Sequence, residues 1–253
     1  MKAIILAGGK GTRIRELSVD TPKPMIRLGG IPLVLHVTSI LMRQGVTEFW
    51  ICVGYKKDVF YDYFDETFER IEPKRSQGAD LKRYLDIKSG CHFNILDTGP
   101  DTDTGGRLLR VADFLNNSED FIFTYGDGLA DIDLKALLNL HSKKKSFCTI
   151  STFRPRCQYG VIDVSEDGYI ESFIEKPLLN VWSNCGYMVM SHEIFSSISG
   201  DSSNLEQEVL PALATEKRIA VYKHPGFFKA MDTYKEYLEF EEMLKNGGAK
   251  WLQ

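Results

Sequence analysis

The chain has 253 residues, with 31 Lys and Arg against 35 Asp and Glu, which gives a formal net charge of −4. Its hydrophobic content of 43% and charged content of 26% are typical of a globular protein and exclude extensive disorder. A chain of this length can bury most of the surface of its unfolded state, so it needs no disulfide or metal for stability. The mild acidity argues against a nucleic-acid partner, because phosphate backbones require a broad basic face.

The five cysteines are scattered and form no C-x-x-C pair. This pattern argues against a disulfide framework or a structural zinc site and suits a reducing compartment. The first residues, MKAIILAGG, are predicted to form a strand rather than a signal peptide, because no cleavage site follows the short apolar run. No apolar stretch approaches the length that spans a bilayer. We therefore expect a cytoplasmic protein with no membrane partner.

Strands and helices alternate through the first 150 residues. Apolar runs predict strands at 2–7, 48–53, 93–96, 121–125 and 146–153, and helical spacing predicts helices at 32–43, 58–68, 107–115 and 134–141. This alternation is typical of parallel βαβ units. We predict an α/β fold with a Rossmann-like, mostly parallel mixed sheet that is flanked by helices.

The pattern changes after residue 153. Short strands are predicted at 159–164, 169–175, 187–190 and 218–222, and helices at 204–214 and 233–245. We interpret the chain as a single domain with an α/β half at 1–150 and an α+β half at 151–253. The polar segment 69–91 is predicted to be an excursion from the sheet; a solvated insertion, a catalytic lid and a subunit contact are all open interpretations.

A glycine-rich loop, LAGGKGTR, follows the first strand at 6–13. Glycines at this position let backbone N–H groups approach a phosphate, and Lys10 and Arg13 add positive charge. The loop fails the dinucleotide fingerprint because Ile14 stands where that pattern needs its third glycine, and the chain has no Gly-Lys-Ser/Thr of a P-loop. On these residues alone, a strand-to-helix turn with solvated charges is an equal alternative.

A second basic segment, TPKPM, lies at 21–25. The prolines on both sides of Lys23 stiffen the backbone that carries one ammonium group. A rigidly held lysine suits a phosphate clamp, although Pro-rich turns are common at surfaces.

Together these segments resemble the signature of the nucleotidyltransferases that activate sugar 1-phosphates. The resemblance continues along nearly the whole chain and is strongest to the glucose-1-phosphate cytidylyltransferase branch. Its further motifs are DTG at 97–99, TGGRL at 104–108, YGDGLAD at 125–131, EKP at 175–177, HPGF at 224–227 and MDT at 231–233. The resemblance implies formation of CDP-glucose and pyrophosphate from CTP and glucose 1-phosphate, with Mg²⁺ as cofactor, in a homo-oligomer.

The resemblance also implies roles for particular residues. The catalytic residues would be Arg13, Lys23 and Lys176, and the two metal ligands Asp127 and Asp232. The half at 1–150 would bind the nucleotide through Leu6, Ala7, Gly8, Gly9, Gly11, Thr12, Arg13, Lys23, Thr104, Gly105, Gly106, Arg107 and Asp127. The half at 151–253 would bind the sugar phosphate through Tyr159, Gly160, Glu175, Lys176, Asn184 and Gly186.

Elementary chemistry is consistent with these roles. Asp127 follows a predicted parallel strand, and open α/β sheets bind ligands at the carboxyl ends of their strands. Mg²⁺ accepts one or two carboxylates and completes its shell with water and phosphate oxygens. The alternatives are a turn for Asp127 and a helix N-cap for Asp232. We expect the main chain to contact the base at Gly105 and Gly106, because glycine has no side chain that would keep the base away.

Three other functions remain to be compared. The enzyme could use a different base or a different phosphomonoester. It could be a non-catalytic regulatory subunit that binds sugar nucleotides, although the presence of all five charged site residues argues against this. A nicotinamide oxidoreductase is disfavoured by the failed dinucleotide fingerprint.

Overall fold

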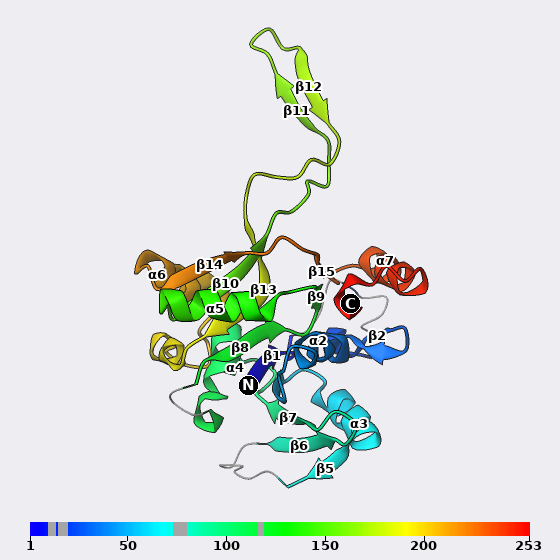
Figure 1. Ribbon diagram of the computed structural model, residues 1–253, viewed down its shortest axis with the longest axis vertical. Coiled ribbons are helices and arrows are strands. Elements are labelled where there is room, and N and C mark those ends of the chain that lie inside the picture. Colours follow the sequence, from blue (N-terminus) through cyan, green and yellow to red (C-terminus); the bar gives the residue numbers. More distant parts are fainter. Residues whose placement is uncertain (10–13, 15–19, 73–79, 116–118) are drawn as a thin grey trace.

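The computed structural model describes residues 1–9, 14, 20–72, 80–115 and 119–253. Within these residues, nine strands form one twisted mixed sheet in the order β14-β10-β13-β8-β1-β4-β7-β6-β5 (Figure 1). Their bounds are β1 Lys2–Leu6, β4 Glu48–Val53, β5 Glu69–Ile71, β6 Leu81–Asp86, β7 Cys91–Asp97, β8 Phe121–Tyr125, β10 Cys148–Phe153, β13 Ser183–Met190 and β14 Ile219–Lys223.

The centre of the sheet is parallel, as predicted. β1 pairs in parallel with β4 on one side and with β8 on the other, and β4 pairs in parallel with β7. The helices α2 (Leu33–Met42) and α3 (Lys57–Thr67) connect these strands. The carboxyl ends of β1 and β8 therefore meet at one edge of the sheet, next to each other.

Both faces of the sheet are buried, which explains why its central strands are apolar throughout. Ala3 and Ile5 of β1 face a core cluster with helices α2, α3, α5 (Leu134–Lys144) and α7 (Tyr234–Lys245). Ile4 and Leu6 face a second cluster, on the side of α4 (Thr104–Leu109) and α6 (Leu210–Thr215). The expected flanked α/β sheet is confirmed.

The second half of the chain extends the same sheet. β13 lies antiparallel between β8 and β10, and β14 pairs in parallel with β10. A small antiparallel pair, β9 (Gly128–Ala130) with β15 (Phe228–Ala230), also joins the two halves. The remaining short elements are β2 Arg27–Leu28, β3 Ile31–Pro32, η1 Lys23–Met25, η2 Ala112–Phe114, η3 His192–Ser197, η4 Leu205–Val209 and η5 Lys250–Leu252.

The described residues of the polar segment 69–91 form strands of the sheet, so the expected excursion from the sheet was wrong for them. β6 pairs antiparallel with β7, and β5 with β6. The sequence does not reveal this strand because only one residue of β6, Tyr84, is fully buried, so the strand is mostly polar. The ring of Tyr84 packs on Phe64 of α3 with centroids 5.5 Å apart. Edge strands commonly carry charged residues, which discourage pairing with other chains.

Residues 154–182 form an arm that projects far from the body of the molecule (Figure 1). Its tip is a two-stranded hairpin, β11 (Val161–Val164) with β12 (Ile170–Ile174). Apolar side chains on this arm are exposed, including Tyr169 at 76% and Phe173 at 64%. Among the described helices, none is long and apolar enough to cross a bilayer.

Candidate active site

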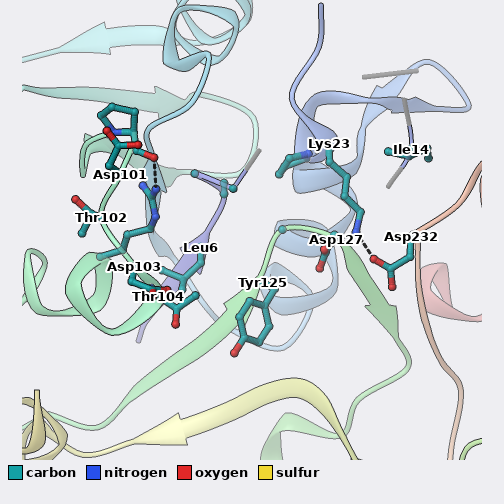
Figure 2. A pocket seen from close by; sticks show the side chains of 17 residues that line it. Leu6, Ile14, Lys23, Asp101, Thr102, Asp103, Thr104, Tyr125, Asp127 and Asp232 are labelled. Atoms are coloured by element: carbon teal, nitrogen blue, oxygen red, sulfur yellow. Dashed lines mark hydrogen bonds and ion pairs between the residues drawn. The ribbon is translucent and has the colours of Figure 1, made fainter. Parts of the chain in front are cut away.

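A pocket of about 580 Å³ opens where the parallel strands β1 and β8 end. This volume is in the range of small-ligand sites. Figure 2 shows Lys23, Asp127 and Asp232 on one side of the pocket and residues 101–104 on the other, with Tyr125 between them. The described lining residues are Leu6, Ala7, Gly8, Gly9, Ile14, Lys23, Pro24, Pro100, Asp101, Thr102, Asp103, Thr104, Arg107, Tyr125, Gly126, Asp127 and Asp232.

Lys23 lies between the two aspartates predicted to bind metal. Its Nζ donates to Asp127 Oδ2 at 2.7 Å and to Asp232 Oδ1 at 2.8 Å (Figure 2). The lysine is 9% exposed and starts the short helix η1, flanked by Pro22 and Pro24. The backbone on both sides of this buried lysine is therefore proline, as the sequence indicated.

The pairing of β9 with β15 brings the aspartates together. Asp127 immediately precedes β9, Asp232 closely follows β15, and the backbone N–H of Met231 donates to the carbonyl of Asp127 at 3.0 Å. The N-cap of α7 is Thr233, whose side chain accepts from the backbone of Glu236 in a capping box. The alternative of Asp232 as N-cap is thereby excluded, and its carboxylate is directed to Lys23.

The two carboxylates stabilise the charged form of Lys23. Burial by itself would lower the pKa of Lys23, but the carboxylates of Asp127 and Asp232 outweigh it and raise that pKa above its usual value. Lys23 is therefore a permanent cation at neutral pH. Two carboxylates that converge on one positive charge can also serve a divalent cation.

Arg107 forms the inner wall of the pocket. Its guanidinium is nearly buried and donates from Nη1 to Thr98 Oγ1 at 2.7 Å and to the Val53 carbonyl at 3.2 Å. A Cβ at Gly8 would lie 2.1 Å from this Nη1. Gly8 thus has a packing reason to be glycine that the sequence does not reveal: it makes room for the guanidinium of Arg107.

The reason expected for the two glycines of α4 was wrong. A Cβ on Gly105 would lie 2.7 Å from the Ser203 carbonyl oxygen, and one on Gly106 would lie 2.4 Å from that of Asp201. The backbone N–H of Gly105 also donates to Ser203 at 2.9 Å. Both glycines therefore admit the loop 201–203 rather than a base, and neither lines the pocket.

Tyr125 and Glu206 were missed as site residues. Tyr125, the last residue of β8, lines the pocket, and its hydroxyl donates to Glu206 at the start of η4. Thr104 Oγ1 donates to the same carboxylate at 2.6 Å. The position of Tyr125 at a strand end, two residues before Asp127, is a signal that could have revealed it; Glu206 has no comparable signal in the sequence.

A smaller hollow of about 170 Å³ adjoins the pocket and shares Tyr125, Asp127 and Asp232 with it. Asn184 and Gly186 of β13 line this hollow, and Asn184 Oδ1 accepts from the N–H of Gly186 at 2.8 Å. Gly186 has a φ of +81°, and a Cβ there would lie 2.9 Å from the Tyr125 ring. Two of the predicted sugar-phosphate residues are therefore next to the predicted metal ligands.

The other four predicted sugar-phosphate residues lie on the arm, where they line neither cavity of their own chain. Lys176 pairs with the adjacent Glu175 at 3.6 Å, with both side chains 61% exposed, and Tyr159 is 75% exposed. Gly160 lies against the ring of Phe173 in the hairpin. Within its own chain, Lys176 is therefore not beside the predicted metal ligands, because the arm carries it away from the sheet.

Other polar side chains have structural roles. His36 is buried and bonds to the Leu28 carbonyl at 3.0 Å, and Asp133 caps α5. Asp131 accepts from the backbone N–H of Phe227 at 2.5 Å. Gly11, Thr12 and Arg13 of the glycine-rich loop lie outside the described residues.

Comparison with known proteins identifies the family. The sequence model described as "Nucleotidyl transferase" matches residues 2–227, nearly nine-tenths of the chain. The chain belongs to this nucleotidyl transferase family. Its members generally use a divalent metal ion and bind a nucleoside triphosphate and a sugar phosphate.

Curated relatives match along almost their whole length. A glucose-1-phosphate cytidylyltransferase of Salmonella typhi is 36% identical over 254 residues, which cover 99% of this chain and 98% of the relative. A protein of Bacillus subtilis named probable glucose-1-phosphate cytidylyltransferase is 37% identical over 253 residues, covering 99% of both chains. The crystal structure of HddC from Yersinia pseudotuberculosis superposes with a TM-score of 0.71 at 23% identity, covering 96% of this chain and 99% of that one, and so shares the fold.

The residues present fit a divalent cation. Asp127 and Asp232 offer hard oxygen donors that converge on one position, beside a pocket large enough for phosphate groups. Among the residues that the structure describes, no group of three His, Cys, Asp or Glu could hold a metal ion. Two carboxylates suit Mg²⁺, which takes its remaining ligands from water and substrate phosphates.

Proposed function

We propose that this protein transfers the cytidylyl group of CTP to glucose 1-phosphate, forming CDP-glucose and releasing pyrophosphate. The observation that carries the proposal is the pairing of Lys23 with Asp127 and Asp232 inside the pocket, at 2.7 and 2.8 Å. The names of relatives that are 36–37% identical over almost the full chain support the choice of CTP and glucose 1-phosphate.

The chemistry requires two polyanions to approach each other. The phosphate of the sugar attacks the α-phosphorus of the triphosphate, and pyrophosphate leaves. Mg²⁺, when bound at Asp127 and Asp232, supplies positive charge that stabilises the transition state. Lys23 and Arg13 would hold the triphosphate, and a forked guanidinium is suited to phosphate oxygens. No general base is needed, because the attacking phosphate oxygen is already anionic, and no histidine is among the described lining residues.

Arg107 gives the pocket a way to choose the base. Its buried guanidinium can only donate hydrogen bonds. Cytosine offers two adjacent acceptors, O2 and N3, whereas in uracil the acceptors O2 and O4 stand on either side of the N3–H donor. A guanidinium N–H that faces position N3 would therefore pair with cytosine but would meet a second donor in uracil. We therefore propose that Arg107 favours cytosine, with Leu6, Ala7, Gly8, Gly9 and Thr104 forming the rest of the nucleotide site.

We also propose that the protein is a homo-oligomer whose arms reach neighbouring subunits. Two observations support this proposal: the apolar side chains of the arm are exposed, and Lys176 and Glu175 line neither cavity of their own chain. In an assembly, the arm of one subunit would bring Lys176 to the sugar phosphate bound beside Asn184 and Gly186 of another. Residues 1–150 would then supply the nucleotide site and 151–253 the sugar-phosphate site.

The five cysteines are free thiols, and four of them are buried. Free thiols persist in reducing compartments, so we propose that the protein works in the cytoplasm.

Pyrophosphate release, measured with four triphosphates and several sugar phosphates, tests the reaction and its substrates. We expect the catalytic efficiency with CTP to exceed that with UTP at least about tenfold, which corresponds to about 1.4 kcal/mol. Equal use of CTP and UTP would overturn the choice of base but keep the reaction class. A purified protein that binds CDP-glucose yet turns over no triphosphate would be a regulatory subunit instead.

A further inference from the structure

The cluster of Lys23, Asp127 and Asp232 has a property that a simple metal site lacks. The ammonium of Lys23 contacts both carboxylates that would bind the metal, at 2.7 and 2.8 Å. A divalent cation at this position would meet a positive charge in direct contact with both of its protein ligands. Like charges at such short distances repel each other. The side chain of Lys23 is 11% exposed, and those of Asp127 and Asp232 are 33% and 40% exposed.

We propose that Lys23 is an internal counter-ion that keeps divalent cations off Asp127 and Asp232 until a triphosphate draws its ammonium away. The inference rests on the proposed function, which supplies the triphosphate. It adds an order to that function: the free protein binds a metal ion weakly, and the site becomes available only when the nucleotide is present.

Three features of the structure support this role. First, Pro22 and Pro24 hold the backbone on both sides of Lys23, so only the flexible side chain has to move. Second, Lys23 and both aspartates line the same pocket that would receive the phosphates. Third, the cluster carries a net charge of −1 with Lys23 in place, so the carboxylates are not left unpaired in the free protein.

Metal binding to the protein without nucleotide is the decisive measurement. Mn²⁺ takes the same oxygen ligands as Mg²⁺, and the signal of unbound Mn²⁺ in electron paramagnetic resonance reports how much is free. Lys23→Met removes the charge and keeps the length of the side chain. We expect it to tighten Mn²⁺ binding at least about tenfold, and at the same time to weaken the binding of metal-free CTP. A misfolded variant would instead bind both Mn²⁺ and CTP more weakly.

Matched variants separate the charge from other effects. Lys23→Arg keeps the positive charge and should keep the weak Mn²⁺ binding of the wild type. The double variant Lys23→Met with Asp127→Asn should not show the tighter Mn²⁺ binding expected of Lys23→Met alone. Lys143→Met, at the exposed end of α5, changes the net charge of the chain equally and should leave Mn²⁺ binding unchanged. Lys23→Gln serves in place of Lys23→Met if circular dichroism shows that the latter does not fold.

Two results would overturn the inference: Mn²⁺ affinity unchanged in Lys23→Met, or a gain of equal size in Lys143→Met. Either result would leave the proposed reaction standing if the wild type releases pyrophosphate from CTP and glucose 1-phosphate. Conversely, a wild type without transferase activity would refute the proposed function, while the metal measurement, which uses no substrate, would still decide the role of Lys23.

Discussion

At the scale of single residues, the site depends on a few charges placed where water has limited access. Lys23 and Arg107 are almost fully buried, yet each has polar partners: two carboxylates for the lysine, and a hydroxyl and main-chain carbonyls for the arginine. A buried charge without partners would be strongly unfavourable. These partners also hold both cations at the wall of the pocket, which Lys23 and Arg107 line.

Asp127→Asn should lower pyrophosphate release by at least about a hundredfold while the protein stays folded. The physical reason is that the amide carries no charge, and a bound Mg²⁺ contributes several kcal/mol to this kind of step. Asp133→Asn is the matched control, because Asp133 caps α5 and asparagine is an equally good N-cap. Near-native turnover of Asp127→Asn would show that Asp127 is only a turn residue.

At the scale of elements, the site is held together by contacts between segments far apart in the sequence. The loop 201–203 and the start of η4 pack against α4 through Gly105, Gly106 and the hydrogen bond from Thr104 to Glu206. Lys57 of α3 bridges Asp80 and Asp97, the last residue of β7, at 2.7 Å each. The residue after Asp97 is Thr98, which accepts a hydrogen bond from the pocket residue Arg107.

Gly106→Ala should destabilise the protein by about 1–3 kcal/mol, because its methyl group would overlap the backbone of Asp201. Denaturant unfolding measures this change in the free energy of unfolding. Gly200→Ala is a matched control in the adjoining loop, since no atom lies within 4 Å of the Cβ it would add. Equal stability of Gly106→Ala and the wild type would mean that the loop 201–203 shifts without cost.

The Lys57 bridge predicts a pH-dependent effect on stability. The hydrogen bond from Lys57 is the main cause that lowers the pKa of Asp80. A depressed carboxyl pKa stabilises the folded state above the pKa of the unfolded state, about 3.9, and this contribution is lost as the pH falls through the folded value. Lys57→Met should therefore lower the free energy of unfolding at pH 7, and with it the thermal midpoint. The expected loss is about 1 kcal/mol or less, because the pair is partly exposed. The difference in thermal midpoint between Lys57→Met and the wild type should be smaller near pH 3. A difference that is as large at pH 3 as at pH 7 would indicate lost packing instead of lost charge.

At the scale of the whole molecule, the arm separates residues that the reaction requires together. Figure 1 shows the hairpin of β11 and β12 well away from the sheet, and Lys176 lies at its base, beyond the strand β12. Exposed apolar residues on a long projection favour association. A second subunit would both cover these residues and receive Lys176.

Mixed oligomers test this arrangement directly. Lys176→Ala and Asp127→Asn should each be nearly inactive alone, yet their co-expression should restore measurable activity, because some sites would combine an intact arm with an intact metal site. Light scattering should show a single oligomeric species. Co-purified mixtures that stay as inactive as the separate variants, or a fully active monomer, would contradict the shared site.

Much of this protein was determined by the sequence alone. The alternation of apolar strands and amphipathic helices predicted the flanked parallel sheet, because the periodicities of strands and helices are local properties. The resemblance to the nucleotidyltransferase signature, carried by motifs around Lys23 and Asp127, also pointed to two residues that line the pocket. Such signals are carried by a few neighbouring residues and need no knowledge of the rest of the chain.

Only the tertiary structure decided which distant residues meet. The pairing of β9 with β15 places Asp232 beside Lys23, the loop 201–203 explains Gly105 and Gly106, and the arm removes Lys176 from the pocket of its own chain. None of these contacts has a local signature, since each depends on backbone pairing or packing between segments that are far apart in the sequence. The chemistry of each side chain was therefore readable from the sequence, whereas its partners were set by the fold.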